Sequence, residues 1–309
     1  MKVLFVRSGN NGEDPITQNQ AESLIGENLN VLFFDIIGKG INGYLSNIFK
    51  LRDVIKKQNP DIIHAHYSFS AYIAVLAFSK KPVVCSLMGS DVNATNLFQK
   101  TILRICIKYF WKATIVKSSK MKDVLKIKNV YVIPNGVDFS RFPIIDGAEA
   151  KHRLKWDISK QQILFPANPK RIEKNYELAE KIFLKIKEEY PEIELKTLVN
   201  VPHKETHLYY CAASMVLFTS LAEGSSNVIK EALVCNCPIV SAPVGDVEEN
   251  LKNVTNSFIA FTFNDYIKYV REVLESKLRS NGRDCITHLD STVIAKKVIC
   301  IYNKVLNKS

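Results

Sequence analysis

Short apolar runs alternate with longer amphipathic stretches along the whole chain. Stretches such as YELAEKIFLKIKEEY (176–190) carry apolar residues three and four positions apart, which is the spacing of a helix that buries one face. Nearly continuous apolar strands separated by such helices are typical of parallel sheets that are covered on both faces. The pattern therefore predicts an α/β fold. The predicted strands are 2–7, 31–34, 61–65, 82–87, 113–117, 130–134, 162–167, 194–199, 215–220, 238–242 and 257–260.

A punctuated segment divides the chain into two halves. Residues 133–150 read IPNGVDFSRFPIIDGAEA, in which Pro, Asn-Gly and a second Pro mark a loop. A chain of 309 residues also suits two domains of about 150 residues each. We predict two facing Rossmann-like, doubly wound domains, 1–145 and 146–290, with a cleft between them. Ligands of such sheets bind beyond the carboxyl ends of the strands.

The composition favours a globular protein in a reducing compartment. No apolar stretch approaches the roughly 20 residues that span a bilayer. The opening MKVLFVRSGNNG has only a short apolar run, which indicates a buried strand rather than a signal peptide. The seven cysteines are scattered and form no C-x-x-C pair, so we expect free thiols and a cytoplasmic location.

The net charge of +11 is concentrated in the first half of the chain. Residues 1–145 carry 19 Lys and Arg against 10 Asp and Glu, whereas the remaining residues are nearly balanced. Nine of the cations lie in residues 98–128, where a four-residue repeat predicts a basic stripe on an amphipathic helix. The stripe consists of Lys100, Arg104, Lys108 and Lys112, with Ile102, Ile105, Tyr109 and Phe110 beside it.

This basic stripe has two interpretations. It suits an anionic membrane surface, where each nearby cation contributes about 1 kcal/mol. A helix that packs on the sheet and exposes a basic face to solvent explains it equally well. No recognised nucleic-acid-binding motif accompanies the charge, so we expect no nucleic-acid partner.

Residues 223–231 read EGSSNVIKE and directly follow the apolar run MVLFTS (215–220). On a helix, Glu223 and Glu231 would lie about 12 Å apart along the axis and within roughly 80° of one face. That separation is comparable to the distance from the sugar to the ribose of a nucleotide sugar. The alternative is a capped helix with two solvated carboxylates. The residues that would offer backbone N–H groups to an anion are Gly224, Ser225, Ser226 and Asn227.

A basic loop follows the first predicted strand of the second half. Its sequence is NPKRIEKN (168–175), and it places Arg171 and Lys174 beyond the carboxyl end of that strand. Cations in this position can neutralise a diphosphate. Basic loop residues are usually only solvated, but together with EGSSNVIKE they supply both kinds of charge that bind a nucleotide diphosphate-sugar.

The first half offers a glycine-rich turn and a pair of histidines. The turn SGNNG (8–12) lacks the G-x-G-x-x-G order of a dinucleotide site, so we do not expect NAD. Its small residues would let a donor phosphate or an acceptor approach the backbone. In DIIHAHYS the two histidines are expected to face opposite ways, with one of them in the ligand site and a satisfied core histidine as the alternative. The candidate acceptor-side residues here are Gly9, Asn10, Asn11, Gly12, His66 and Tyr67.

His203 and His207 (HKETH) have the i,i+4 spacing of a metal-binding pair. No third ligand or adjacent acidic base is apparent in the sequence. We therefore predict a surface helix and no metal site.

The chain resembles the large family of retaining GT-B glycosyltransferases that contains sucrose synthases, glycogen synthases and mannosyltransferases, the family 4 type. The resemblance covers nearly the whole chain. In the second half it is carried by IPNGVDFSRF, FPANPKRIEKN and TSLAEGSSNVIKEALVCNCPIVSAPVGDVEE, which contains an E-x7-E segment like that of the family. In the first half it is carried by RSGNNG, HAHYSFSAYIA and SLMGSDV.

The resemblance implies transfer of a sugar from a nucleotide diphosphate-sugar to a glycan or lipid-linked acceptor, without a metal ion or another cofactor. Arg171 and Lys174 would bind the diphosphate, and Glu223 would hold hydroxyls of the transferred sugar. Glu231 would bind the ribose, with backbone N–H groups from Ser226 to Val228 near the sugar and phosphate. The last helix, about 291–309, would pack back on the first domain.

One departure from the family lies in SLMGSD, where members often carry a histidine before the glycine. Met88 stands at that place, while Gly89 and Asp91 remain on the acceptor side. Two further hypotheses therefore stay open. One is a nucleotide-sugar epimerase of the same fold, and the other is a catalytically silent subunit that binds the nucleotide sugar.

Overall fold

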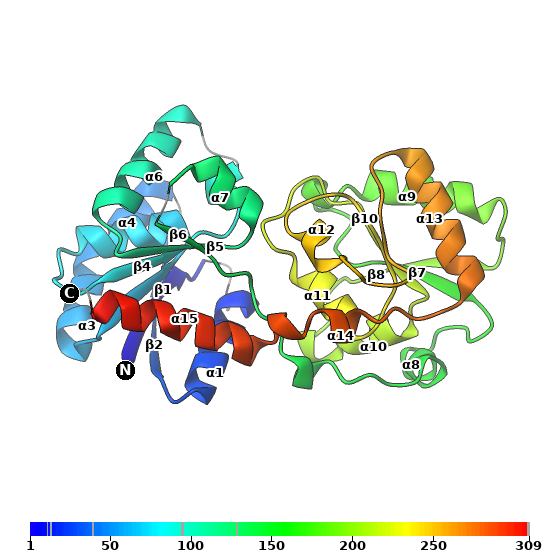
Figure 1. Cartoon of the computed structure of the whole chain (residues 1–309), viewed down its shortest axis with the longest axis horizontal. Helices are drawn as coiled ribbons and strands as arrows, with labels where there is room; N and C mark the ends of the chain where they lie inside the picture. Colours follow the sequence, from blue (N-terminus) through cyan, green and yellow to red (C-terminus); the bar gives the residue numbers. More distant parts are fainter. Residues whose placement is uncertain (11, 13, 39, 94–95, 128, 308–309) are drawn as a thin grey trace. The chain divides into compact units, whose positions relative to one another are not determined.

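The computed structural model describes residues 1–10, 12, 14–38, 40–93, 96–127 and 129–307. Two compact units make up the chain (Figure 1). The first is Met1–Gly136 together with Ser291–Ser309, and the second is Val137–Asp290. Each unit contains one parallel sheet with helices around it, so the predicted α/β, GT-B class of fold is confirmed.

All eleven predicted apolar runs form strands, with ends that differ by only a few residues. The first sheet has the order β2-β1-β3-β4-β5-β6 and the second has β11-β10-β9-β7-β8. The strands are β1 (Lys2–Ser8), β2 (Asn30–Ile36), β3 (Ile62–His66), β4 (Val83–Ser86), β5 (Ala113–Val116), β6 (Val130–Val132), β7 (Gln161–Phe165), β8 (Ile193–Thr197), β9 (Met215–Phe218), β10 (Ile239–Ser241) and β11 (Phe258–Ile259).

Helices connect successive strands in both units. In the first unit they are α1 (Pro15–Gly26), α2 (Gly40–Leu45), α3 (Ile48–Gln58), α4 (Ser68–Leu76), α5 (Ser90–Asn93), α6 (Leu97–Tyr109), α7 (Ser119–Leu125) and α15 (Ser291–Leu306). In the second they are α8 (Gly147–Leu154), α9 (Tyr176–Lys187), α10 (Thr206–Ala212), α11 (Asn227–Val234), α12 (Val247–Asn250), α13 (Phe263–Ser276) and α14 (Gly282–Cys285). Short 3-10 helices include η2 (Ile172–Lys174) and η3 (His203–Glu205).

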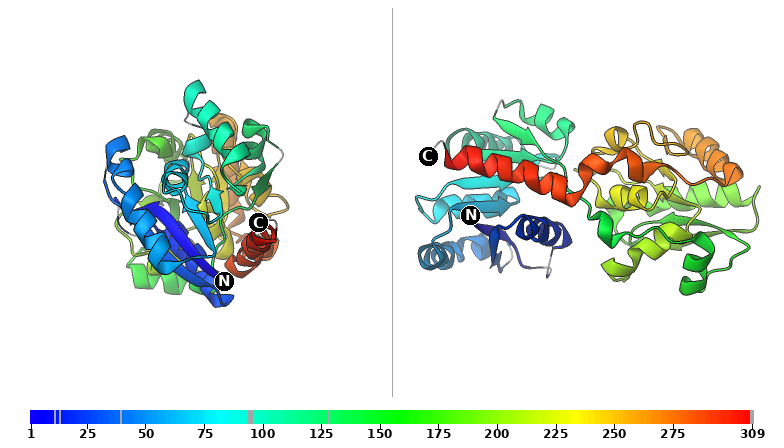
Figure 2. Two further views of the ribbon diagram at one scale, coloured as in Figure 1. Left: turned by 90° about the vertical axis from the view of Figure 1, so that its left-hand side faces the viewer. Right: turned by 60° about the horizontal axis from the view of Figure 1, so that its bottom comes forward.

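The C-terminal helix α15 belongs to the first unit. It packs beside α1, and Figure 2 shows it from two further directions, next to the elements of the first unit. Hydrogen bonds join His64 Nδ1 to the Tyr302 hydroxyl (2.5 Å) and His64 Nε2 to the Ser86 hydroxyl (2.8 Å). Burial lowers the pKa of His64 to about 3, so the ring is neutral at pH 7. A buried polar link therefore fastens the last helix to β3 and β4.

Each sheet has a core on both of its faces. In the first unit, apolar side chains of α3, α4, α6 and α7 form one cluster with the sheet. In the second unit, α9 and α13 cover one face of the sheet, while α10, α11 and α14 pack together. The alternation of the strands places their remaining apolar residues on the opposite face.

The basic segment 98–128 is not one helix. It contains α6, β5 and α7, and α6 ends at Tyr109. Lys112 therefore lies beyond the helix, and the stripe on α6 consists of Lys100, Arg104 and Lys108. Among the described residues, none of the helices has both the length and the apolar character that crossing a membrane requires.

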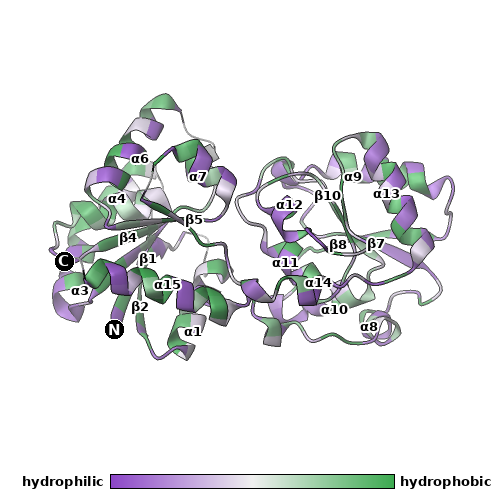
Figure 3. Ribbon diagram, in the orientation of Figure 1, coloured by the Kyte–Doolittle hydropathy of each residue, from purple (hydrophilic) through white to green (hydrophobic). Residues whose placement is uncertain are grey.

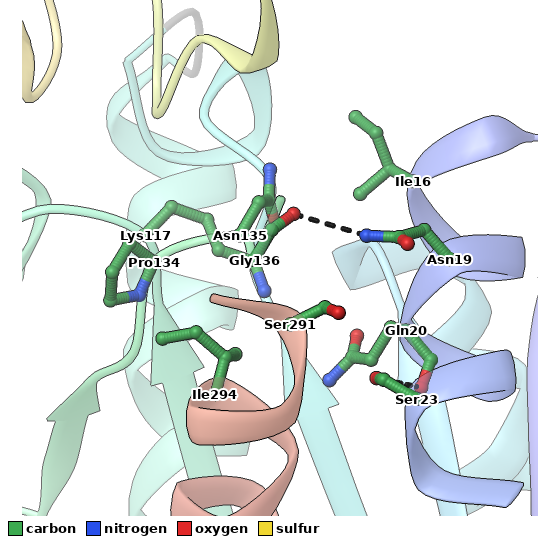
Figure 4. A pocket seen from close by; sticks show the side chains of 10 residues that line it. All are labelled: Ile16, Asn19, Gln20, Ser23, Lys117, Pro134, Asn135, Gly136, Ser291 and Ile294. Carbon is green, nitrogen blue, oxygen red and sulfur yellow. Dashed lines mark hydrogen bonds between the residues drawn. The ribbon is translucent and has the colours of Figure 1, made fainter. Parts of the chain in front are cut away.

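The junction motif IPNG lies against the start of α15. Figure 4 shows Asn19 reaching from α1 to the carbonyl oxygen of Gly136, to which it donates a hydrogen bond of 3.1 Å. A Cβ on Gly136 would lie only 2.8 Å from the Cα of Ser291, which explains the glycine. The pocket in this view holds about 10 Å³, which is room for about one water molecule. These residues therefore pack α1, the junction motif and the start of α15 together.

Candidate functional site

The candidate donor site lies in the second unit, where the order of strands reverses. The chain runs from β7 to its neighbour β8 on one side, and β9 lies on the other side of β7. Ligands of doubly wound sheets bind at this kind of reversal. Thr219, just after β9, donates hydrogen bonds to the carbonyl oxygens of Lys174 (3.1 Å) and Asn175 (2.9 Å). The two loops predicted to bind the donor are thus joined directly.

Lys174 and Glu223 form an ion pair across these loops. Lys174 Nζ lies 2.5 Å from Glu223 Oε1, and the two side chains are only 11% and 17% exposed. The sequence assigned them to different parts of the donor, and the structure brings them into contact. An ammonium group has three donors, so Lys174 can hold Glu223 and still bind a phosphate oxygen.

Arg171 differs from Lys174 in its surroundings. Its guanidinium is 57% exposed and pairs with Glu173 of the same loop, with Nε 2.7 Å from Oε1. An exposed pair of this kind contributes little to stability. Arg171 is therefore free to exchange this partner for a ligand.

The interpretation of EGSSNVIKE as one helix is wrong at its start. Helix α11 begins at Asn227, so Glu223 lies in the preceding loop and the axial distance expected between the glutamates does not apply. Gly224 and Ser225 are held outside the helix by residues after β10, described next. Ser226 stands at the N-cap without a side-chain capping bond. The Ser226 side chain therefore does not use the N–H groups of the first turn, around Asn227 and Val228. An anion site at this helix start needs N–H groups that no side chain occupies.

A buried cluster that the sequence analysis missed fixes this loop. Ser225 Oγ donates to Asp246 Oδ2 at 2.6 Å, and Lys230 Nζ lies 3.5 Å from the same oxygen and donates to Ser225. Lys230 is fully buried, and burial lowers its pKa. Gly245 has φ 58°, and a Cβ there would lie 2.9 Å from the carbonyl oxygen of Gly224. The signal in the sequence was a lysine within the apolar helical pattern VIKEALV.

Glu231 is buried and holds two partners. Its Oε1 lies 3.0 Å from His203 Nε2, and its Oε2 accepts a hydrogen bond of 3.0 Å from the Tyr210 hydroxyl. The hydrogen bond to Glu231 raises the pKa of His203, and burial raises the pKa of Tyr210 well above its ordinary value. The two partners, one on each carboxylate oxygen, fix the Glu231 side chain in place.

The prediction that HKETH is a surface helix holds only in part, because exposed His203 also contacts the buried Glu231. His203 lies in η3, whereas His207 lies in α10, so the pair does not share one regular helix. The His203 ring is 44% exposed and packs edge-on against Phe142. The position of His203 after β8, at the carboxyl edge of the sheet where ligands bind, could have indicated from the sequence that it belongs to the site.

The first unit has a polar pocket at its own reversal of strand order, between β1 and β3. Its volume is about 330 Å³. It combines residues at or just after the carboxyl ends of β1, β3 and β4, which are separate motifs in the sequence. The residues that line this polar pocket are Arg7, Ser8, Gly12, Asp14, Pro15, His66, Tyr67 and Met88.

Two other predicted acceptor-side residues of the first turn make contacts within the fold. A Cβ on Gly9 would lie 2.8 Å from the Cβ of Asp35, so a larger residue would require β2 to shift. The Asn10 amide donates to the carbonyl oxygen of Gly38 and accepts from its N–H, each at 2.8 Å. Both residues therefore hold the loop after β2, while Asn11 lies outside the described residues.

Asp91 and Gly89 shape the SLMGSD loop. The Asp91 carboxylate accepts the backbone N–H groups of Met88 and Gly89, each at 3.0 Å, and that of Ser68 at 3.1 Å. Burial raises the pKa of this carboxyl. Gly89 has φ 128°, a conformation that favours glycine. Asp91 therefore fastens the loop to the start of α4 and presents Met88 to the polar pocket.

The expectation that His64 and His66 face opposite ways is wrong. Residues two apart on a strand lie on the same face, and the two rings stack with centroids 4.4 Å apart. His66 is buried, and within the described part of the chain neither ring nitrogen has a hydrogen-bond partner. Burial lowers its pKa well below the ordinary value, so the ring is neutral. A neutral imidazole at the pocket wall offers one donor and one acceptor to a ligand.

Two family models match the chain, one in each half. The model described as Glycosyltransferase Family 4 matches residues 14–141, and the model described as Glycosyl transferases group 1 matches residues 171–276. The first contains the elements of the polar pocket from Asp14 onward. The second contains Lys174, Glu223 and Glu231.

Individual proteins agree with these matches. The putative teichuronic acid biosynthesis glycosyltransferase TuaC of Bacillus subtilis (strain 168) is 26% identical over 213 residues, which are 61% of this chain and 54% of TuaC. The match thus spans about half the length of that relative. Sucrose-phosphate synthase from Thermosynechococcus elongatus shares the fold with a TM-score of 0.80 at 14% identity, covering 100% of this chain and 99% of that one. Anabaena HepE in complex with UDP has a TM-score of 0.78 at 14% identity, with 98% and 100% covered. With both halves matched in order, the chain belongs to the GT-B glycosyltransferases of the family 4 type.

Proposed function

We propose that the protein moves a sugar from a nucleotide diphosphate-sugar onto a glycan or lipid-linked acceptor in cell-surface glycan synthesis. The observation that carries this proposal is the contact of Lys174 with Glu223 at the reversal of strand order in the second sheet, in the unit that also buries Glu231. Similar proteins support it. TuaC is named for teichuronic acid biosynthesis, and HepE has been solved with UDP and with UDP-glucose.

The proposed reaction retains the anomeric configuration. The acceptor hydroxyl attacks the anomeric carbon from the face that the diphosphate leaves, and a leaving phosphate oxygen takes the acceptor's proton. Lys174 and Arg171 stabilise the charge that develops on the diphosphate, which is work that a metal ion does in other enzymes. The proposal therefore includes neither a metal ion nor another cofactor.

The two glutamates hold the ends of the donor in this proposal. A carboxylate oxygen can accept more than one hydrogen bond, so Glu231 can bind ribose hydroxyls while it keeps His203 and Tyr210. Glu223 binds hydroxyls of the transferred sugar, and the ammonium of Lys174 connects it to the diphosphate. The first-turn N–H groups of α11, which the Ser226 side chain does not cap, lie between these positions in the sequence and would bind phosphate.

Titration of the purified protein with UDP, GDP and ADP tests the donor site. We expect micromolar binding of one nucleotide by calorimetry, weakened about tenfold or more in Glu231→Ala, because hydrogen bonds to a charged group are lost. The exposed Glu192→Ala is the control and should bind as the unchanged protein does. A folded protein that binds none of the three nucleotides would overturn the donor assignment.

Product analysis separates the alternative functions. An epimerase converts the donor when no acceptor is present, whereas the proposed transferase needs an acceptor to form a new glycoside. A silent subunit binds the nucleotide sugar and neither transfers nor hydrolyses it.

His66 is proposed to contact the acceptor in the polar pocket. His66→Phe keeps an aromatic ring against Phe5, whose centroid lies 4.5 Å away, but removes both ring nitrogens. Because those nitrogens are buried without partners, we expect the melting temperature to stay the same or rise. We expect kcat/KM for the acceptor to fall about 10- to 100-fold, as for a lost polar contact. Unchanged acceptor use with a lower melting temperature would instead make His66 a core residue.

We also propose that the protein works in the cytoplasm, on the inner face of the membrane. Helix α6 buries Leu103 and Ile107 in the core and exposes both its basic stripe and neighbouring apolar residues. This arrangement suits an anionic bilayer surface, where cations attract the headgroups and apolar side chains enter the interface.

A further inference from the structure

The first unit contains a second cavity that the proposed roles do not use. It lies among α2, α4, α5 and α6 and has a volume of about 470 Å³, within the roughly 300–1,000 Å³ of pockets that hold small ligands. We call it the apolar groove, because aromatic and aliphatic side chains dominate its wall. They include Tyr44, Leu45, Phe69, Tyr72, Leu76 and Ile102.

The apolar groove and the polar pocket share a wall residue. Tyr67 lines both cavities, and its ring stacks on Phe69 with centroids 5.8 Å apart. Its backbone has φ 79°, which is strained for a bulky side chain. The two cavities together therefore offer one ligand a polar end and an apolar end.

Polar side chains also line the groove, but several are already paired, since Asn96 and Gln99 each accept a backbone N–H of the other at the start of α6. The Asp91 carboxylate is already occupied by three backbone N–H groups. A peptide in the groove would bury its own N–H and C=O groups, each of which needs a partner. A hydrocarbon chain has no such requirement.

The surroundings of the groove are apolar and basic. Phe98 at its rim is 72% exposed, and its neighbour Leu97 at the start of α6 is 80% exposed. Exposed apolar clusters of this kind mark binding surfaces for lipids or proteins. Green and purple residues alternate along α6 in Figure 3, and its cations are Lys100, Arg104 and Lys108. The charge favours a ligand with an anionic head.

We propose that the apolar groove binds the hydrocarbon chain of a lipid-linked, anionic acceptor, whose head reaches the polar pocket past Tyr67. This inference rests on the proposed function and specifies its acceptor. The bound hydrocarbon chain would position the head of the acceptor next to His66. The basic face of α6 would attract the phosphate of the same lipid. Recognition of the chain then adds to affinity without any contact to the sugar.

Tryptophan fluorescence can report occupancy of the groove. Trp111 is buried and stacks on the groove residue Tyr72, with centroids 5.8 Å apart and 24° between the rings. The chain has two tryptophans, so Trp156→Phe in the second unit leaves Trp111 as the sole reporter. Farnesyl diphosphate serves as the probe, and inorganic diphosphate serves as the same charge without a chain.

We expect farnesyl diphosphate to change the fluorescence saturably and inorganic diphosphate to have no effect. Ile102→Gln should weaken the binding at least tenfold, because it places a polar group in the wall of the groove. Ile105→Gln is the matched control on the same helix, outside the groove, and should bind as the parent does. Gln is a good helix former, so neither change should disturb α6.

Three results would overturn the inference. In the first, the folded protein shows no saturable fluorescence response. In the second, both variants weaken the binding equally, which would place the lipid on the outer face of α6. In the third, Ile102→Gln binds farnesyl diphosphate as the parent does. Nucleotide titration of the same proteins separates this inference from the proposed function. If a nucleotide binds and farnesyl diphosphate does not, only the groove assignment fails. If farnesyl diphosphate binds and no nucleotide does, the acceptor role fails together with the proposed function.

Discussion

Lys174→Ala is expected to lower kcat for sugar transfer about 10²–10³-fold, with a smaller change in nucleotide affinity. The reason is that charge accumulates on the diphosphate as the glycosidic bond breaks, and a fixed, sheltered cation stabilises that charge most in the transition state. The substitution also leaves Glu223 without its partner at 2.5 Å. Steady-state kinetics with the donor identified by titration measure the change.

The same loop provides a matched control for Lys174. Lys170 lies four residues earlier and is exposed, so Lys170→Ala should leave the rate close to that of the unchanged protein. Arg171→Ala should lie between the two, because its side chain is exposed and already pairs with Glu173. A loss of less than tenfold in Lys174→Ala, in a protein that melts normally, would contradict the assigned role.

Lys230→Met is expected to destabilise the second unit by about 3–5 kcal/mol. Methionine fills a similar volume, but Asp246 is then a buried charge without its cation. The loop that carries Glu223 and Ser225 loses its anchor at the same time. Urea unfolding followed by Trp156 fluorescence, with Trp111 changed to Phe, reports this unit.

The double variant Lys230→Met with Asp246→Asn tests the cause. Because the second change removes the unpaired charge, we expect it to recover part of the lost stability. Transfer activity should stay low in both variants if the cluster positions Glu223. Equal stability of the single variant and the unchanged protein would show that Lys230 is not paired as described.

The sheets were predictable from the sequence, whereas the partners of the polar side chains were not. Apolar runs such as 215–220 are buried on both faces, and this signal is local. One partner of Glu231 is His203, which lies 28 residues earlier in the chain. The spacing of residues within α11 does not reveal the contact between Glu231 and His203. That contact depends on the order β9-β7-β8, because His203 follows β8 and α11 follows β9.

Local patterns determine some features of the site, whereas contacts between distant residues determine others. The common face of His64 and His66 follows from the two-residue period of a strand and needed no structure. The displacement of Glu223 from α11 depends instead on Ser225, Lys230 and Asp246, which meet only in the folded chain. Gly9 and Asn10 likewise looked open to a ligand because their contacts come from the loop after β2.

The hydrogen bond between His64 and Tyr302 has a consequence for synthesis on the ribosome. The first unit is built from two segments of the chain, Met1–Gly136 and Ser291–Ser309. Nδ1 of His64 in β3 therefore lacks its hydrogen-bond partner until Tyr302 has been added. The second unit is continuous from Val137 to Asp290 and can complete its contacts earlier. Although its residues are translated later, the second unit is therefore the first that can reach its final form, and the nascent first unit must wait for α15.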